Sequence, residues 1–165
     1  MPEKQTLERA KKAKRRGKSA GTQSGEFVRE EMHHIREGKH GARSAKQAIA
    51  IALSKARRAG VNLPPPEKGK VSEKTRRGAQ RAYQLGQRGK IKTSQGRSRA
   101  RERVLKREGR SAASRRALAQ QTRSAARRRT RAERSAAARR AVWTKGRRGR
   151  SAAARKAART RARQG

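Results

Sequence analysis

Apolar side chains recur at helical spacing mainly within residues 22–63. Val28, Met32 and Ile35 follow one another at i, i+4 and i+7, and this spacing predicts a helix with one apolar face. Ser24 is a suitable N-cap, because its hydroxyl oxygen accepts a hydrogen bond from a free backbone N–H of the first turn. The pattern therefore predicts a first helix that begins after Ser24.

A second helix is predicted after a short loop at residues 39–43. Gly38 is a favourable end for the first helix, because glycine adopts the left-handed conformation that closes many helices. Ser44 and Gln47 have the spacing of a capping box, which opens a helix, and Gly60 is expected to end it. The predicted apolar face consists of Ala45, Ala48, Ile49, Ala52, Leu53 and Ala56.

These two helices predict an all-α fold built around a small helical hairpin at about 22–63. Val61 and Leu63 are expected to fold back onto the hairpin as a hydrophobic lid, before Pro64 and the two prolines after it interrupt regular structure. A segment of this size buries little apolar surface, so the hairpin is expected to be only marginally stable alone.

The rest of the chain is polar and basic, and composition divides it into three further segments. Residues 1–21 are predicted to form a basic N-terminal arm, helical from Leu7 to Arg16. Residues 64–96, which contain prolines and glycines, are predicted to be a basic linker. Residues 97–165 are predicted to be an Arg/Ala-rich, histone-like tail. Arm and tail are expected to be helix-prone but largely non-globular.

The predicted tail carries an irregular Arg-Ser-Ala-Ala repeat that begins at positions 110, 123, 134 and 150. Each copy offers a serine N-cap followed by alanine and arginine, which are strong helix formers. Arginines four residues apart, such as Arg123, Arg127 and Arg131, repel one another by about 0.2–0.5 kcal/mol per pair. We therefore expect tail helices that fray in dilute salt and become more helical when phosphates neutralise the repulsion.

Charge and composition point from this helical framework to a polyanion partner. The 165 residues include 51 Lys and Arg against 11 acidic residues, all Glu, for a formal net charge of +40. Hydrophobic residues make up 30%, mostly alanine, with Phe27, Tyr83 and Trp143 as the aromatic ones. So little apolar surface does not offset the ordering entropy of the whole chain. Duplex DNA, with one charge per about 1.7 Å, is the polyanion whose charge density fits best.

Catalytic and metal chemistry are not expected. The chain has neither Asp nor Cys, and its histidines lie between positions 33 and 40, so neither a Ser-His-Asp triad nor an acid pair is supported. Glu31 and His34 have the Glu-x-x-His spacing of di-metal bundles, which need two such copies. We expect His33, His34 and His40 to be exposed and paired with neighbouring Glu. The protein is predicted to be no enzyme, with no cofactor, metal or small-molecule substrate.

A membrane is the competing anionic surface. The longest purely apolar run is the six residues from Ala48 to Leu53, far too short for a membrane span or a signal-peptide core. A helix lying on a membrane needs bulky Trp, Phe or Leu along one face, whereas the predicted tail offers alanine, with arginine on every face. We therefore expect a cytoplasmic, nucleoid-associated protein without membrane contact.

Two features near the end of the chain leave alternatives open. Residues 145–150 (Lys-Gly-Arg-Arg-Gly-Arg) either form an extended Arg-Gly-Arg hook for the minor groove of DNA or break the chain between two helix-prone segments. Trp143 either wedges between bases or anchors a partner, or else makes a local hydrophobic contact on a nascent helix.

Several blocks of the chain resemble a family of small basic bacterial proteins. The blocks are the first five residues (Met-Pro-Glu-Lys-Gln), Ser24 to Glu31 (Ser-Gly-Glu-Phe-Val-Arg-Glu-Glu), His34, Gly38 to Ser44 and on to Gly60, and Leu105 to Ala113. This family is a domain of unknown function whose members are often labelled DNA-binding. The tail is similar in composition to those of bacterial histone H1-like proteins. Both resemblances imply nucleic-acid binding, and neither implies an enzyme or a cofactor.

Sequence-independent DNA binding by phosphate neutralisation is the function that these patterns favour. The predicted contacts are Arg15, Arg16, Arg36, Lys39, Arg43, Arg57, Arg58, Arg110, Arg123, Arg127, Arg128, Arg129, Arg131, Arg139, Arg140, Arg147, Arg148, Arg150, Arg155 and Arg159. RNA binding or ribosome association uses the same electrostatics and stays open. A third hypothesis is a protein-binding adaptor. In this hypothesis the hairpin contacts a protein partner or a second copy of the chain. Its charge is modest, with eight Lys and Arg against four Glu over residues 22–60.

Overall fold

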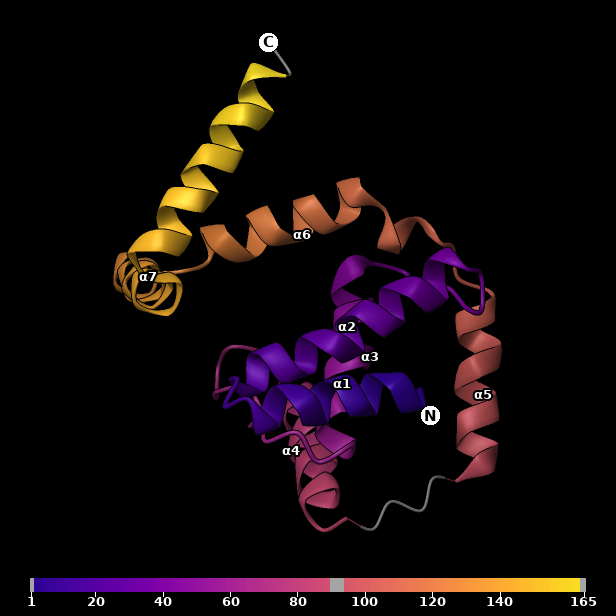
Figure 1. The fold of residues 1–165 in the computed structure, drawn as a ribbon. Coiled ribbons are helices and arrows are strands. Elements are labelled where there is room, and N and C mark those ends of the chain that lie inside the picture. Colours follow the sequence, from indigo (N-terminus) through magenta and orange to yellow (C-terminus); the bar gives the residue numbers. More distant parts are fainter. Residues whose placement is uncertain (1, 90–93, 164–165) are drawn as a thin grey trace. The chain divides into compact units, whose positions relative to one another are not determined.

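Helices are the only regular elements in the part of the chain that the computed structural model describes, residues 2–89 and 94–163. The all-α class is therefore confirmed. The elements are α1 (Lys4–Arg15), α2 (Ala20–Arg36), α3 (Ala45–Arg58), α4 (Glu73–Gln87), α5 (Gln95–Lys106), the 3-10 helix η1 (Ser111–Ala113), α6 (Arg115–Arg127) and α7 (Arg131–Ala162) (Figure 1). Residues 90–93 of the predicted linker lie outside the described ranges. The chain divides into two units, Met1–Gln121 and Thr122–Gly165.

The predicted basic arm is a packed helix of the first unit rather than a non-globular segment. α1 runs alongside α2 (Figure 1), and Thr6 and Ala10 on its inner face are buried. Ala10 and Leu7 belong to the same apolar cluster as Phe27 of α2. Because Leu7 and Ala10 are three residues apart, they share one side of the helix. Because lysines and arginines surround these two residues, the overall composition of the segment does not reveal its apolar face.

α2 begins at Ala20, earlier than predicted, because Ser19 rather than Ser24 caps it. The Ser19 hydroxyl oxygen accepts a hydrogen bond of 3.3 Å from the Thr22 N–H. Ser24 lies inside the helix, is 1% exposed, and donates its hydroxyl to the Ala20 carbonyl oxygen at 2.8 Å. A serine inside a helix commonly returns its hydroxyl to the preceding turn in this way. The predicted cap is therefore wrong by five residues.

α3 begins and ends where the sequence predicts. The Ser44 hydroxyl accepts a hydrogen bond of 3.2 Å from the Gln47 N–H, and the Gln47 side-chain oxygen accepts one of 2.7 Å from the Arg43 N–H. At the other end Gly60 has a φ of 83°. The Val61 N–H then bonds the carbonyl oxygen five residues earlier at 3.1 Å, which is the Schellman arrangement. Val61 is buried against the helices, as predicted for the lid.

The core of the first unit consists of two apolar clusters, and alanines of α3 contribute to both. One cluster joins Met32, Ile35, Ala42, Ala48, Ala112 and Ala113, and the other joins Ala10, Phe27, Ala52, Ala56 and Val61. Small side chains at a contact let helix axes approach closely. The segment 22–63 is therefore not a separate module but the centre of a larger unit, to which α1, α4 and η1 also contribute.

A large part of the predicted linker forms α4, which packs on α3. Ser72 caps the helix, its hydroxyl oxygen accepting a hydrogen bond from the N–H three residues later at 3.4 Å. Ala79, Ala82 and Gly86 are buried on the side that meets α3. The linker prediction is wrong for this stretch. Its glycines predict a chain break, but Gly86, with Ala79 and Ala82, is small enough to form the contact surface.

The segment that follows α5 also belongs to the first unit rather than to a free tail. The Gly41 N–H donates to the Leu105 carbonyl oxygen at 2.8 Å, and the Ala42 N–H donates to the Gly109 carbonyl oxygen at 3.1 Å. Ala112 of η1 packs into the cluster between α2 and α3. The change of composition at residue 97 is therefore not a structural boundary, and the first unit extends to residue 121.

The second unit consists mainly of α7, and each of its described side chains is exposed. The Thr130 hydroxyl accepts a hydrogen bond of 3.1 Å from the Glu133 N–H, and the Glu133 carboxylate accepts one of 2.8 Å from the Thr130 N–H. These two bonds complete a capping box. Gly146, with φ 61° and ψ −179°, interrupts the helical geometry and kinks the helix. Local propensity and capping, not burial, account for this helix.

Candidate nucleic-acid interface

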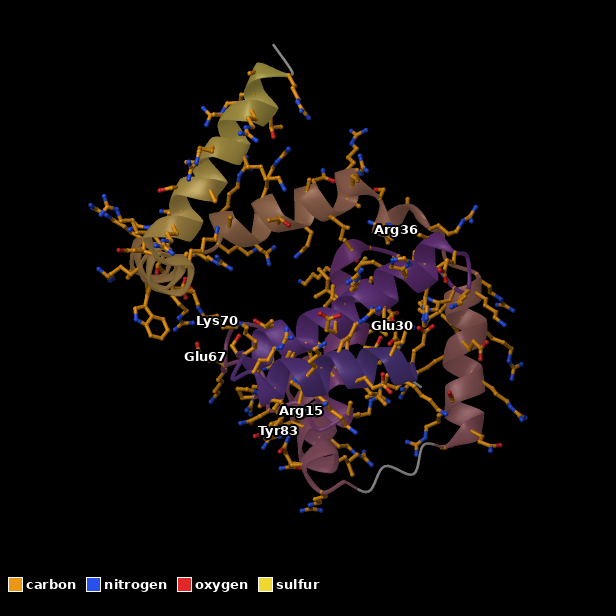
Figure 2. All side chains as sticks on the ribbon, viewed as in Figure 1. Arg15, Glu30, Arg36, Glu67, Lys70 and Tyr83 are labelled. Atoms are coloured by element: carbon orange, nitrogen blue, oxygen red, sulfur yellow. The ribbon has the colours of Figure 1, made fainter. Side chains whose placement is uncertain are left out.

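Three arginines of the first unit surround one open hollow. Arg36 at the end of α2, Arg110 before η1 and Arg115 at the first residue of α6 line it together with Ala113 and Ser114, and its volume is about 470 Å³. Arg36 Nε donates to the Ala113 carbonyl oxygen at 3.0 Å, which holds this guanidinium beside the hollow (Arg36 is labelled in Figure 2). The hollow therefore brings guanidinium groups from three parts of the chain to one place.

The start of α6 adds a second attraction for anions at the same hollow. The Ser114 hydroxyl accepts a hydrogen bond of 3.1 Å from the Ala117 N–H and caps the helix. The other backbone N–H groups of a first turn have no partner inside the helix, and the helix dipole is positive at this end. Arginine binds phosphate oxygens through two parallel N–H groups. Helix start and arginines together suit a phosphate group.

Sequence reasoning named Arg36 and Arg110 as contacts but missed Arg115. Ser114 is a good N-cap for a helix that opens with Arg115, so local sequence contained a signal for the helix start. No local signal brings Arg36 next to Ala113, because these residues are 77 positions apart. The hollow is a product of tertiary packing.

The predicted contacts of the second unit and of the end of α6 are all exposed. They are Arg123, Arg127, Arg128, Arg129, Arg131, Arg139, Arg140, Arg147, Arg148, Arg150, Arg155 and Arg159. α7 carries 12 Lys and Arg against one Glu. Its 32 residues rise by about 1.5 Å each, so one cation occurs about every 4 Å of helix. Phosphates follow one another about every 3.4 Å along each DNA strand. Figure 2 shows nitrogen-tipped side chains on several sides of this helix.

Four predicted contacts on the first unit differ in exposure. Arg15, Arg16 and Arg43 are exposed. Arg58 is half-buried, and burial lowers its pKa, as does the positive charge of Arg101 to a smaller extent. An arginine remains charged under such conditions. Arg58 and Arg101 thus repel each other, and an anion bound near both would offset this repulsion.

Lys39 is exposed, as predicted, but it shares its charge with two carboxylates. Its Nζ lies 3.1 Å from Glu37 Oε2 and 3.4 Å from Glu3 Oε1. The hydrogen bond with Glu37 raises the pKa of Lys39. His34 and then Lys39 lower the pKa of Glu3. Lys39 therefore offers less free positive charge to a ligand than the sequence suggested.

Arg57 is the predicted contact that the structure removes from the surface. It is 7% exposed. Its Nε donates to the Leu63 carbonyl oxygen and its Nη2 to the Pro64 carbonyl oxygen, both at 3.1 Å. Burial lowers the pKa of Arg57. This side chain ties the segment after α3 to the helix, so its predicted role as a contact is corrected here, and Arg57 is left out of the interface.

The two open alternatives near the end of the chain now have a structural context. Residues 147–150 are helical, so the extended hook is not the conformation of this segment. The interruption at Gly146 agrees with the alternative, a break between two helical stretches. Trp143 is 84% exposed, which leaves most of its ring surface open to a ligand.

The acidic and histidine side chains near the end of α2 are not arranged as the sequence suggested. His33 is exposed, but Glu31 is fully buried, and His34 and His40 are half-buried beside it. The reason is tertiary packing: Lys55 of α3 bonds Glu31 at 2.6 Å, and residues before α1 reach His34. The expectation that the three histidines are exposed is therefore wrong for His34 and His40.

Comparison with known proteins gives no matching family model, no matching curated protein and no matching solved structure. Among the helices of the described ranges, none combines the length and the apolar character needed to cross a membrane.

Proposed function

We propose that the protein binds duplex DNA through its phosphates, without reading base sequence, and associates with the nucleoid in this way. The observation that carries the proposal is the exposure of the α7 cations at a spacing close to that of phosphates along a DNA strand. Contacts with phosphate position a protein on DNA and carry no direct sequence information. The proposal includes no catalytic step and no cofactor.

The hollow at Arg36, Arg110 and Arg115 supports the proposal in the first unit. Its arginines converge on one place next to a helix start, so it offers one phosphate several donors that are already in position. The α7 cations are spread along a helix and engage a polyanion of any sequence. The first unit would thus bind the phosphate backbone at one fixed point, and the second unit would extend the contact along the DNA.

The packing of the first unit favours this function over a protein-binding adaptor. The apolar face of the predicted hairpin is covered by the protein's own helices. Ala48 of α3 packs with Ala112 and Ala113 of η1, and Ala52 shares a cluster with Ala10 of α1. A partner that used this face would first have to displace these elements, and that would cost the burial they provide.

A salt series tests the proposal. Fluorescence anisotropy with a labelled DNA duplex should give a log–log slope near −9 if about ten phosphates are contacted. The variant R147Q/R148Q/R150Q should make the slope about 3 units shallower and weaken binding equally on unrelated sequences. The matched variant K11Q/K12Q/K14Q removes the same charge from α1 and should change the slope less. A slope near zero for the unaltered protein would contradict the proposal.

An RNA duplex of equal length provides the second arm of the experiment. DNA and RNA carry similar backbone charge, but the A-form helix of RNA presents different groove widths. The proposal expects DNA to bind at least as tightly as RNA across the salt series. Consistently tighter binding to RNA would transfer the function to RNA and contradict nucleoid association.

A further inference from the structure

A cluster of three side chains lies where the end of α2 meets the loop before α3. Glu31 and His34 come from α2, and His40 comes from the loop. One potential ligand atom from each of the three lies within 4.8 Å of the others. The His34 and His40 rings meet edge to face, with centroids 6.0 Å apart. Two imidazoles and one carboxylate form a donor set that zinc takes in proteins.

The Glu31 carboxylate is set up to bind a cation through one oxygen. Glu31 is 0% exposed. Its Oε2 accepts a hydrogen bond of 2.6 Å from Lys55 Nζ, while its Oε1 is buried without a hydrogen-bond partner and lies 3.5 Å from His40 Nε2. A buried acceptor left without a partner is unfavourable, and more so when it is charged. Oε1, the oxygen without a hydrogen-bond partner, lies on the side of the carboxylate that faces His40.

His40 is oriented so that one ring nitrogen faces the cluster. Its Nδ1 lies 3.1 Å from the Gly41 carbonyl oxygen. A carbonyl oxygen only accepts, so Nδ1 is the donor in this contact. In the neutral ring this tautomer has the Nε2 lone pair facing Glu31. Histidines that bind metals commonly donate their other N–H to a backbone carbonyl in this way. His34 has a comparable outer partner in Glu3, whose Oε1 lies 2.8 Å from His34 Nε2.

The charge around the cluster also suits a dication. The protein carries a net charge of +40, yet this corner is acidic. Glu3, Glu30 and Glu31 meet here with two lysines. Glu30 resembles Glu31 in having a buried oxygen, Oε1, without a hydrogen-bond partner. Three carboxylates against two ammonium groups leave an excess of negative charge, to which a dication is attracted.

We propose that Glu31, His34 and His40 bind one zinc ion, with water in the fourth position. Zinc would join the loop that carries His40 to the last turns of α2. That loop also holds the last turn of α5, because the Gly41 N–H bonds the Leu105 carbonyl oxygen. The role of the ion would therefore be structural. The proposal is independent of DNA binding.

Zinc titration of the full-length protein, freed of nucleic acid, tests the proposal by isothermal calorimetry. We expect one equivalent of zinc to bind. H34Q and H40Q each remove a ligand, so affinity should fall by more than the ~10–100-fold that loss of an outer partner causes. H33Q is the matched control, since His33 is exposed and lies 3.6 Å from Glu37 rather than in the cluster. An equal loss in H33Q, or unchanged affinity in H34Q and H40Q, would overturn the site.

Cobalt substitution provides a readout that needs no variant. Co²⁺ in a four-coordinate site with nitrogen and oxygen ligands should give visible absorption bands that saturate at one equivalent and disappear when zinc is added. Bands of six-coordinate, solvent-like cobalt, or none beyond those of free ion, would contradict the proposal. Circular dichroism of each variant before titration shows whether a loss of binding reflects the missing ligand or a lost fold. If a variant does not fold, the cobalt absorption spectrum of the unaltered protein decides whether the site exists.

Discussion

α3 and α7 are both capped, alanine-rich helices, yet α3 forms the centre of a core and α7 has no buried residue. The difference lies in how the alanines are spaced. In α3 the buried alanines are Ala45, Ala48, Ala52 and Ala56, three or four residues apart and so on one face. In α7 they come in runs, such as 136–138 and 152–154. Successive residues of a helix lie about 100° apart, so a run of three spreads over about 200° and forms no narrow face. Spacing acts together with content here, because α3 also carries Ile49, which packs against the core on the same side.

The largest difference between the two regions should follow from replacing a lysine in each. K55M leaves the buried Glu31 and Glu30 carboxylates without their shared cation and should lower the free energy of unfolding by about 3 kcal/mol. K156M, at an exposed position of α7, should change it by less than about 0.5 kcal/mol. Urea unfolding with a chelator present measures both. Equal effects would mean that the charges of the first unit are not in fact buried.

Two glycines of α4 separate packing from helix propensity within one helix. A methyl group at Gly86 would overlap the Arg57 carbonyl oxygen, whereas one at Gly78 would meet no atom within 4 Å. G86A should therefore cost about 1–3 kcal/mol or more. G78A should stabilise by about 0.5–1 kcal/mol, since alanine is the better helix former. Thermal unfolding of the pair checks this. If G86A were as stable as G78A, α4 would not pack on α3.

Removing one cap in each helix should give effects of similar size but different form. S44A and T130A each lose a hydroxyl that accepts a hydrogen bond from a first-turn N–H, which costs about 1 kcal/mol. In α3 the loss should lower the stability of the whole first unit without changing its helix content. In α7 it should fray the first turns locally. Hydrogen–deuterium exchange resolves the two cases. Exchange that rises only in the first turns of α3 in S44A, or along the whole of α7 in T130A, would reverse the comparison.

The smallest expected effect is a change in the fluorescence of Trp143. Its indole is 84% exposed, so its emission should shift toward the blue when DNA covers α7 and removes water from the ring. The shift should disappear at high salt together with binding. Unchanged emission at saturating DNA, with anisotropy showing a complex, would place the contact away from this part of α7.

Local sequence predicted the elements with the clearest periodicity and caps, and it failed where burial depends on partners far along the chain. The ends of α3 could be predicted because Ser44 and Gly60 act within one turn. Tyr83 had no visible partner in sequence, yet its hydroxyl donates to Asn62 at 2.6 Å, a contact that exists only because α4 packs on α3. Low hydrophobic content predicts a non-globular arm, and prolines and glycines predict a linker, but both segments contain packed helices. Alanine and glycine let α1 and α4 pack closely although each residue contributes little apolar area.

The candidate sites show the same division. The exposed cations of α7 could be read from composition alone, because a helix without an apolar face exposes everything. The hollow at Arg36 and the surroundings of Glu31 could not be predicted, since both depend on contacts across the fold. The Glu31–His34 spacing was visible, but the participation of His40 requires the loop to turn back onto α2.

The interruption at Gly146 gives the end of the chain a property that a continuous helix would lack. It divides α7 into two cationic stretches of similar length, 131–145 and 147–162, joined by a single residue. Under the proposed function, such a pair would be a bivalent ligand for a polyanion. Once one stretch had bound, the other would be held at a high effective concentration nearby, and its own weak binding would lengthen the residence time of the whole protein. One glycine would thus turn a single charged helix into two linked binding segments that detach one at a time.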